Sequence, residues 1–247
     1  MSSKYKVEFR NIKDAYQLNE RIITEVESLI DLLYLNVDWD KDPLDFVFRK
    51  APAHTFPMLK PFNFNAENIL RPMIGIRREL SKHEKILCQR LQFIIDQCED
   101  ESQVKKAFGT LFERYVYREK SNGQKNVFLN CHLYIQNKKI ENDGVGSIDI
   151  GIDRLDEKEF LEMTECGISI RTFERKSQQQ LNFYSIAFGR VRAVAKKAKL
   201  HFCLVAAHSA RKRNWNDVII DGKSLTANNI NVYADCLLDR VNSEWNH

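Results

Sequence analysis

The chain has 247 residues, of which 43% are hydrophobic and 29% are charged, a composition typical of a globular protein with a sizeable core. Nine Gly and five Pro exclude long low-complexity linkers, and no run of apolar residues is long enough to span a bilayer. The formal net charge of +4 by itself indicates no charged partner.

The start of the chain and the cysteines bear on the compartment. Residues 1–10 are polar and charged and lack the apolar segment of a secretory signal. We therefore expect a cytoplasmic protein, or a nuclear one in a eukaryote, that does not associate with membranes. The cysteines never form a C-x-x-C pair, so a disulfide framework or a zinc site is not indicated. We interpret most of them as small buried hydrophobic residues. They are Cys88, Cys98, Cys131, Cys166, Cys203 and Cys236.

The first hundred residues are predicted to be mainly helical. Apolar residues recur at helical spacing over 12–35, and a second helix is expected over 66–98 with a break near Pro72 or Gly75. Between them, residues 36–65 contain four prolines among aromatic residues, which indicates an irregular connection. No catalytic motif is visible here, so this region is open to a role in substrate reading, dimerisation or bracing.

After residue 100 the pattern becomes that of an α/β fold. The segment 200–208 is apolar at almost every position, as expected of a central strand buried on both faces. We predict a mixed central sheet flanked by helices and preceded by the helical region. The predicted elements are a helix 103–119, strands 127–136, 147–153 and 160–170, a helix 172–199, the strand 200–208, and a final strand or loop with a helix over 228–244.

Positive charge is concentrated in one segment. Between Arg171 and Arg213, eleven Lys and Arg residues stand against one acid, Glu174, which gives this segment a net charge of +10 and leaves −6 for the remainder. Such asymmetry is typical of a surface that binds a polyanion such as DNA, although a solvated helix face is the plainer interpretation. The residues that we assign to nucleic-acid binding are Arg171, Arg190, Arg192, Lys196, Lys197, Lys199, Arg211, Lys212 and Arg213.

Four short motifs fall on successive predicted elements. Each is weak by itself, but their order and their placement on a helix, two strands and a helix add to their weight. The motifs are Gly109 to Glu113 (GTLFE), similar to a GxxFE pattern; Asp149 within GSIDI; Glu165-Cys166-Gly167, at the place of a (D/E)-x-K pattern; and Gln180 to Tyr184 (QLNFY), similar to a QxxxY pattern.

In this order, the motifs resemble the core of PD-(D/E)XK, or restriction-endonuclease-like, nucleases over residues 104–209. We accordingly divide the chain into a helical region, 1–100, and a nuclease-like domain, 101–247. The resemblance implies hydrolysis of DNA phosphodiester bonds by an endonuclease of a restriction, defence or repair system, with Mg²⁺ or Mn²⁺ as cofactor. A homodimer that cuts both strands is a further expectation from this class.

The resemblance also implies the roles of individual residues. Magnesium takes oxygen ligands, usually one or two carboxylates together with waters. Asp149, Glu165 and the backbone carbonyl of Cys166 would be the metal ligands, and Glu113 would hold a metal-bound water or a second ion. Gln180 and Tyr184 would complete the catalytic site. We expect the two carboxylates to be exposed, so that their replacement leaves the fold largely intact.

One departure from the family pattern is serious, because Gly167 occupies the position of the motif lysine. The lysine's role is then taken by another cation, for which Lys176 is the first candidate and Arg171 the second. Lys176 precedes Gln180 by four residues and so shares its helix face. Alternatively, the domain is a degenerate nuclease that binds DNA, or serves in an assembly, without cutting. We prefer the first interpretation. An RNA-directed function has no motif to support it.

Overall fold

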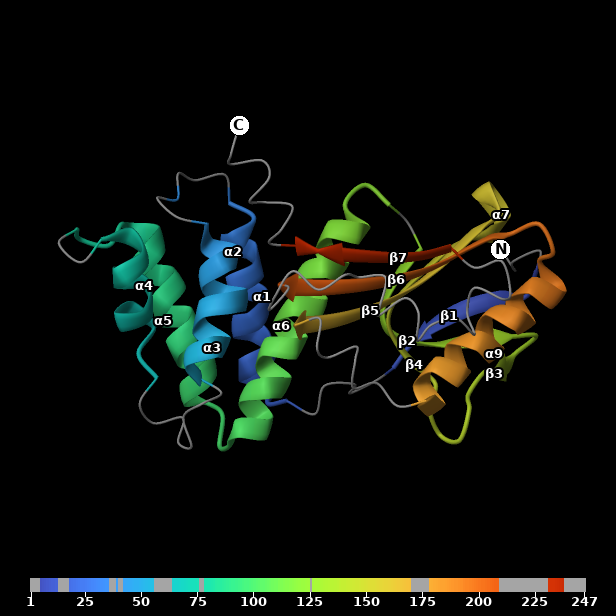
Figure 1. Ribbon diagram of the computed structural model, residues 1–247, viewed down its shortest axis with the longest axis horizontal. Helices are drawn as coiled ribbons and strands as arrows, with labels where there is room; N and C mark the ends of the chain where they lie inside the picture. Colours follow the sequence, from blue (N-terminus) through green and yellow to red (C-terminus); the bar gives the residue numbers. More distant parts are fainter. Residues whose placement is uncertain are drawn as a thin grey trace. The chain divides into compact units, whose positions relative to one another are not determined.

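The computed structural model describes residues 5–12, 18–35, 39, 42–55, 64–75, 78–124, 126–169, 178–208 and 231–237. Its contacts divide the chain into two compact units. We call residues 16–115 the helical unit and residues 1–15 with 116–247 the sheet unit, and describe each by itself (Figure 1). This division differs from the predicted one at residue 100, because helix α6 (Glu101–Ser121) starts just after the predicted boundary and most of it belongs to the helical unit, whereas residues 1–15 belong to the sheet unit.

The sheet unit is built on a seven-stranded sheet with the order β1-β2-β4-β5-β6-β7, in which the short β3 pairs with β2. Neighbours are antiparallel from β1 to β5 and parallel from β5 to β7. The prediction of a mixed α/β fold is therefore confirmed. The strands are β1 (Val7–Asn11), β2 (Val127–Ile135), β3 (Lys138–Lys139), β4 (Ser147–Arg154), β5 (Phe160–Ser169), β6 (Lys199–His208) and β7 (Asn231–Cys236).

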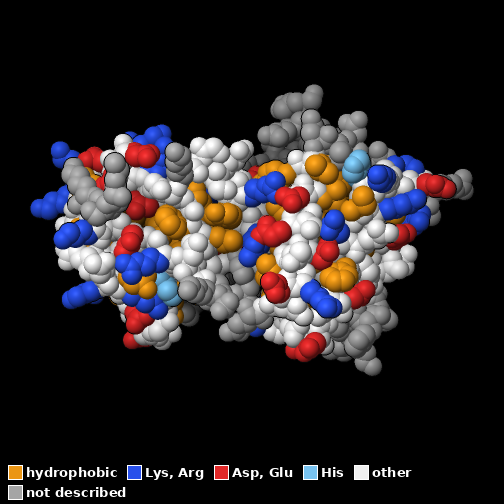
Figure 2. Space-filling model, turned by 180° about the vertical axis from the view of Figure 1, so that it is seen from behind, with side chains coloured by type: hydrophobic (Ala, Val, Ile, Leu, Met, Phe, Trp, Pro, Cys, Tyr) orange, Lys and Arg blue, Asp and Glu red, His pale blue; other side chains and the backbone are white. Residues whose placement is uncertain are grey.

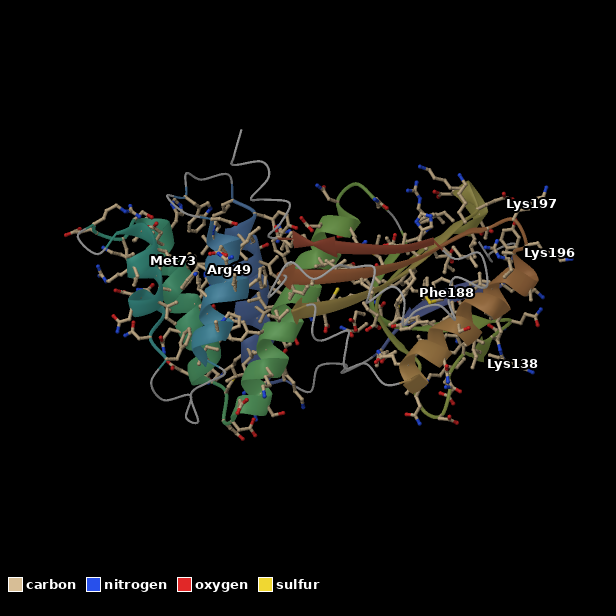
Figure 3. The ribbon with its side chains drawn as sticks, viewed as in Figure 1. Arg49, Met73, Lys138, Phe188, Lys196 and Lys197 are labelled. Carbon is tan, nitrogen blue, oxygen red and sulfur yellow. The ribbon has the colours of Figure 1, made fainter. Side chains whose placement is uncertain are left out.

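Helix α9 (Gln178–Val194) covers one face of this sheet, as Figure 1 shows. Phe183 and Phe188 are fully buried in one hydrophobic cluster with Leu161 and Met163 of β5. Phe188 is labelled in Figure 3, where its side chain lies between α9 and the strands. Because side chains of a strand alternate between its faces, the odd-numbered residues of β5 face α9. This fixes the side of the sheet on which Glu165 lies.

The strand β1 was not predicted from the sequence. Val7 and Phe9 are buried and pair with Ile135 and Leu133 of β2, although the segment reads as polar and charged. Only two apolar residues mark it, and its partner lies more than a hundred residues later in the chain. A pattern that short cannot be recognised without the partner strand.

Gly151 of β4 provides a test of this packing. A Cβ atom added at Gly151 would lie 2.8 Å from the ring of Phe9, whereas one added at Gly189 of α9 would meet nothing within 4 Å. We expect Gly151→Ala to lower the free energy of unfolding by about 1–3 kcal/mol, as overpacking does. Gly189→Ala should raise it by about 0.5–1 kcal/mol through helix propensity. Urea denaturation measures the change in the free energy of unfolding for each variant. Equal changes in the two variants would contradict the close packing of Phe9 on Gly151.

The helical unit contains the helices from α1 to α5 and most of α6. Its second long predicted segment is broken as expected, since Gly75 ends α4 with a positive φ of 100°. Helix α5 starts at a capping box of Ser81 and Glu84, and the buried carboxylate of Glu84 also pairs with Arg78 at 2.6 and 2.8 Å. The helices are α1 (Glu20–Leu33), α2 (Pro43–Asp45), the π-helix η1 (Phe46–Lys50), α3 (Ala51–Thr55), α4 (Ala66–Ile74), α5 (Lys82–Asp96) and most of α6.

Neither unit contains, within its described residues, a helix that is both long and apolar enough to cross a membrane. Helix α1 starts at Glu20, later than the predicted residue 12, because the side chain of Asn19 caps the backbone N–H of Arg21. N-cap residues of this kind fix where a helix begins.

Candidate active site

The first feature of the site is the end of the ladder between β4 and β5. The two strands pair as far as Ile150 and Thr164. At the next position, Oδ2 of Asp149 accepts a hydrogen bond of 2.8 Å from the backbone N–H of Cys166. A side-chain carboxylate thus occupies the place of a backbone acceptor, which brings Asp149 beside the Glu165–Cys166 peptide.

Glu165 lies on the α9 side of β5 and is only 1% exposed. Its Oε2 accepts a hydrogen bond of 3.3 Å from Nε2 of Gln180 on α9. The expectation that both predicted carboxylates are exposed is therefore wrong for Glu165, whereas Asp149 is half-buried. The reason is tertiary, because the helix that follows β5 packs on the face to which Glu165 belongs.

Three predicted site residues are consequently brought together by two strands and a helix: Asp149, Glu165 and Gln180. Tyr184, one helical turn after Gln180, lies in the hydrophobic core instead, with its ring 4.5 Å from that of Phe202. Its buried hydroxyl has no hydrogen-bond partner among the described residues. The structure thus gives Tyr184 a packing role, and its catalytic role stays a prediction.

The donors of this site are suited to a hard cation. The Asp149 and Glu165 carboxylates and the Cys166 carbonyl all offer oxygen, the donor that Mg²⁺ and Mn²⁺ prefer, and one or two carboxylates are the usual protein share of a magnesium site. The described part of the chain brings no three His, Cys, Asp or Glu side chains together as a metal-binding group. A metal here would therefore rest on the two carboxylates, a backbone carbonyl and water.

The remaining predicted catalytic residues are not placed at this site. Glu113 lies on α6 in the helical unit, so its role stays a prediction. The two candidate cations, Lys176 and Arg171, lie outside the described residues. The same is true of three predicted DNA-binding residues, Arg211, Lys212 and Arg213.

The described part of the predicted DNA-binding track divides into two groups. Arg190, Lys196 and Lys197 are exposed, and Figure 3 shows the last two at the turn that follows α9. Arg192 instead donates hydrogen bonds to the carbonyl of Lys196 at 3.1 Å and that of Ala198 at 2.5 Å. The Arg192 guanidinium therefore ties the end of α9 to the turn that leads into β6, because it donates to two backbone carbonyls of that turn.

Lys199, the last described member of the track, lines a cavity with three basic residues that the sequence did not single out: Lys120, Arg154 and Lys158. They come from α6, from the end of β4 and from α7 (Leu155–Lys158), so no motif or charge run connects them in the sequence. Only the folded arrangement of these elements reveals the group.

Asp153 of β4 supplies a pH-dependent test of the sheet unit. Burial raises the pKa of its carboxyl to about 6, against the hydrogen bond that it accepts from the Leu155 N–H. Because the pKa of Asp153 is higher in the folded chain than in the unfolded chain, protonation of this carboxyl favours the fold. This contribution is fully present below about pH 4 and is lost as the pH rises through 6. Asp153→Asn keeps the acceptor and removes the charge. We expect it to raise the free energy of unfolding at pH 8 by about 1–2 kcal/mol, discounted for partial exposure, with little effect at pH 4. Denaturation at both pH values measures the difference, and a variant less stable at pH 8 would contradict it.

The oxygens of the Asp149 and Glu165 carboxylates are of the kind that a hard cation prefers. The Gln180 amide donates to one oxygen of Glu165, and the Cys166 N–H donates to one oxygen of Asp149, so a hydrogen bond helps to orient each carboxylate. Comparisons with protein-family models, with curated proteins and with solved structures gave no match to this chain.

Proposed function

We propose that the sheet unit is a metal-dependent DNA endonuclease that hydrolyses phosphodiester bonds, of the kind found in restriction, defence and repair systems. The observation that carries the proposal is the convergence of Asp149, Glu165 and Gln180 where β4 and β5 separate. A buried carboxylate costs folding free energy, so a position such as that of Glu165 is typical of a functional group. The predicted resemblance to PD-(D/E)XK nucleases supports the same three residues.

Each of these side chains has a separate task. Bound Mg²⁺ or Mn²⁺ supplies the charge that offsets the phosphate and lowers the pKa of the attacking water. Asp149 and Glu165 bind the ion, and the Cys166 carbonyl adds a third oxygen. Gln180 keeps the Glu165 carboxylate in one orientation, which conserves the geometry of the site between turnovers. Arg190, Lys196 and Lys197, exposed on α9 and the turn after it, contact DNA phosphates without selecting a sequence.

The position of Gly167 requires a cation from elsewhere in the chain. Gly167 is buried on β5, two residues after Glu165, and shares its face of the sheet. No lysine side chain is attached there, so the proposal assigns the role to Lys176, with Arg171 as the second candidate. Lys176→Ala should then lose activity in the assay below, and Lys176→Arg should recover it only in part.

The test is cleavage of supercoiled plasmid by the full chain in Mg²⁺, in Mn²⁺ and in EDTA. We expect nicked or linear product with either metal and none with EDTA. Titration of the protein with Mn²⁺ in a calorimeter, without DNA, gives a readout that does not depend on activity. Absence of both metal binding and cleavage would contradict the proposal.

A second function is favoured by Gly167: a degenerate nuclease domain that binds DNA, or serves in an assembly, without cutting it. The two functions predict the same salt-dependent binding of DNA, since the exposed basic residues are common to both. They differ in the plasmid assay. Metal binding and DNA binding without nicking in any buffer would support the second function and exclude the first.

A further inference from the structure

A second candidate site lies in the sheet unit, on the side of β5 opposite to Glu165. It is a cavity of about 330 Å³. Phe160 and Glu162, which line it, have the strand parity opposite to that of Leu161 and Glu165, so they face away from α9. The last turn of α6 meets this face, because Nζ of Lys120 contacts Glu162 at 2.6 Å. The cavity is therefore distinct from the proposed active site.

The charges around the cavity are strongly unbalanced. Among the described residues, the cavity is lined by one carboxylate, that of Glu162, and by the basic side chains of Lys120, Arg154, Lys158 and Lys199. Glu162 is already engaged, because one of its oxygens accepts from both Lys120 and the Thr164 hydroxyl. Figure 2 shows several Lys and Arg side chains on the sheet unit, at the left end of the view, with Asp and Glu side chains among them.

The three basic residues besides Lys120 have little internal compensation. Lys158 and Lys199 are exposed, and Arg154 forms, among the described residues, an ion pair with the exposed Glu157 at 3.9 Å. A surface ion pair of that length contributes little. Three cations facing one cavity match an anion that carries more than one charge. A phosphate monoester, with about −1.5 to −2 charges at pH 7, is such a group.

The cavity also has an apolar side, which an inorganic anion does not need. Ile152 and the half-buried Phe160 line it beside the basic groups. The Phe160 ring is held edge-on against His201, with centroids 4.6 Å apart. An aromatic ring fixed next to cations is suited to stacking on a nucleobase. The volume lies within the range of about 300–1,000 Å³ that small-molecule sites have.

From this combination, we propose that the cavity binds a nucleotide through its phosphate monoester, with Arg154, Lys158 and Lys199 on the phosphate and Phe160 against the base. The nucleotide is either free or the 5′-phosphorylated end of a DNA strand, since both present the same chemistry. The inference does not rest on nuclease activity, because it uses residues on the other face of the sheet.

The experiment is calorimetric titration of the full chain with adenosine 5′-monophosphate, in EDTA so that metal is excluded. We expect a dissociation constant between about 10 µM and 1 mM. The variants Arg154→Ala and Lys158→Ala should each weaken binding by about tenfold, the usual scale for a hydrogen bond to a charged group. The matched control is Lys138→Ala, which removes an exposed lysine from β3, outside the cavity lining, and should bind as the original chain does.

Two further arms test the base and the source. Phe160→Leu should weaken binding of the nucleotide but not of inorganic phosphate. A 5′-phosphorylated oligonucleotide that binds more tightly than its 5′-hydroxyl counterpart, in a manner lost in Arg154→Ala, would identify a strand end as the source. Equal affinity of those two oligonucleotides, with the mononucleotide still bound, would identify a free nucleotide. No binding of the mononucleotide, or equal loss in Lys138→Ala, would overturn the proposal. Loss or retention of plasmid cleavage does not bear on it.

Discussion

Asp149→Asn is expected to reduce plasmid cleavage by at least about a thousandfold, because it removes one of two charged ligands from a metal that contributes several kcal/mol to the reaction. The fold should survive, since the amide oxygen of Asn still accepts the hydrogen bond from the Cys166 N–H. The same variant should also lose Mn²⁺ binding in the calorimeter. Affinity for DNA in EDTA should change little.

A matched control for this variant is Asp143→Asn. Asp143 is exposed in the turn before β4 and has a positive φ of 49°, a conformation that Asn adopts readily. Asp143→Asn makes the same chemical change in the same unit but outside the proposed metal site, so cleavage should be retained. If Asp149→Asn cleaves as well as Asp143→Asn, the assignment of the metal site is wrong.

Glu165→Gln is expected to abolish cleavage to a similar extent and, in EDTA, to raise the stability of the sheet unit. The carboxylate of Glu165 is almost fully buried, and replacing a buried charge by a neutral group of the same shape removes its desolvation penalty. The Gln180 amide can still donate to the new side-chain oxygen. We expect a gain of about 1–2 kcal/mol in the free energy of unfolding, the scale of other stabilising changes at functional sites.

A loss of cleavage together with a gain in stability distinguishes a functional carboxylate from a structural one. If Glu165 were a structural residue, its replacement would lower stability and leave the chemistry unchanged. Urea denaturation in EDTA and plasmid cleavage in Mg²⁺, carried out on the same preparation, give the two readouts. Lower stability together with full cleavage would assign Glu165 to the core.

The sequence predicted strands β2, β4, β5 and β6 closely because each has a clear local pattern, whereas the predicted helix 172–199 already ends at Val194 of α9 and β1 was not predicted. The apolar segment that became β6 and the alternating segment that became β2 are examples. Asp149, Glu165 and Gln180 could be grouped as candidate site residues because their order on successive elements resembles the PD-(D/E)XK pattern. Their environment could not be predicted, since the burial of Glu165 depends on how α9 packs.

The residues missed by the sequence share one property, which is that their partners are remote. Val7 and Phe9 can be recognised as strand residues only from their pairing with β2. Likewise, Lys120 of α6 is far along the chain from Arg154 and Lys158, and it joins them at one cavity only after the sheet has formed. The short-range periodicity of a sequence carries no information about contacts between such remote residues.

The place of β1 in the sheet has a consequence for how the chain is made. Val7 cannot pair with Ile135 until the ribosome has synthesised the intervening residues, and all of the helical unit lies in that interval. Units of a chain fold as their residues emerge, whereas contacts of long sequence separation form slowly. The helical unit is therefore complete before the sheet can close around its first strand. Until β2 has been made, β1 lacks its partner strand. The charged Glu8 and Arg10, which alternate with its apolar residues, are the kind of side chains that protect an unpaired strand from pairing with another chain.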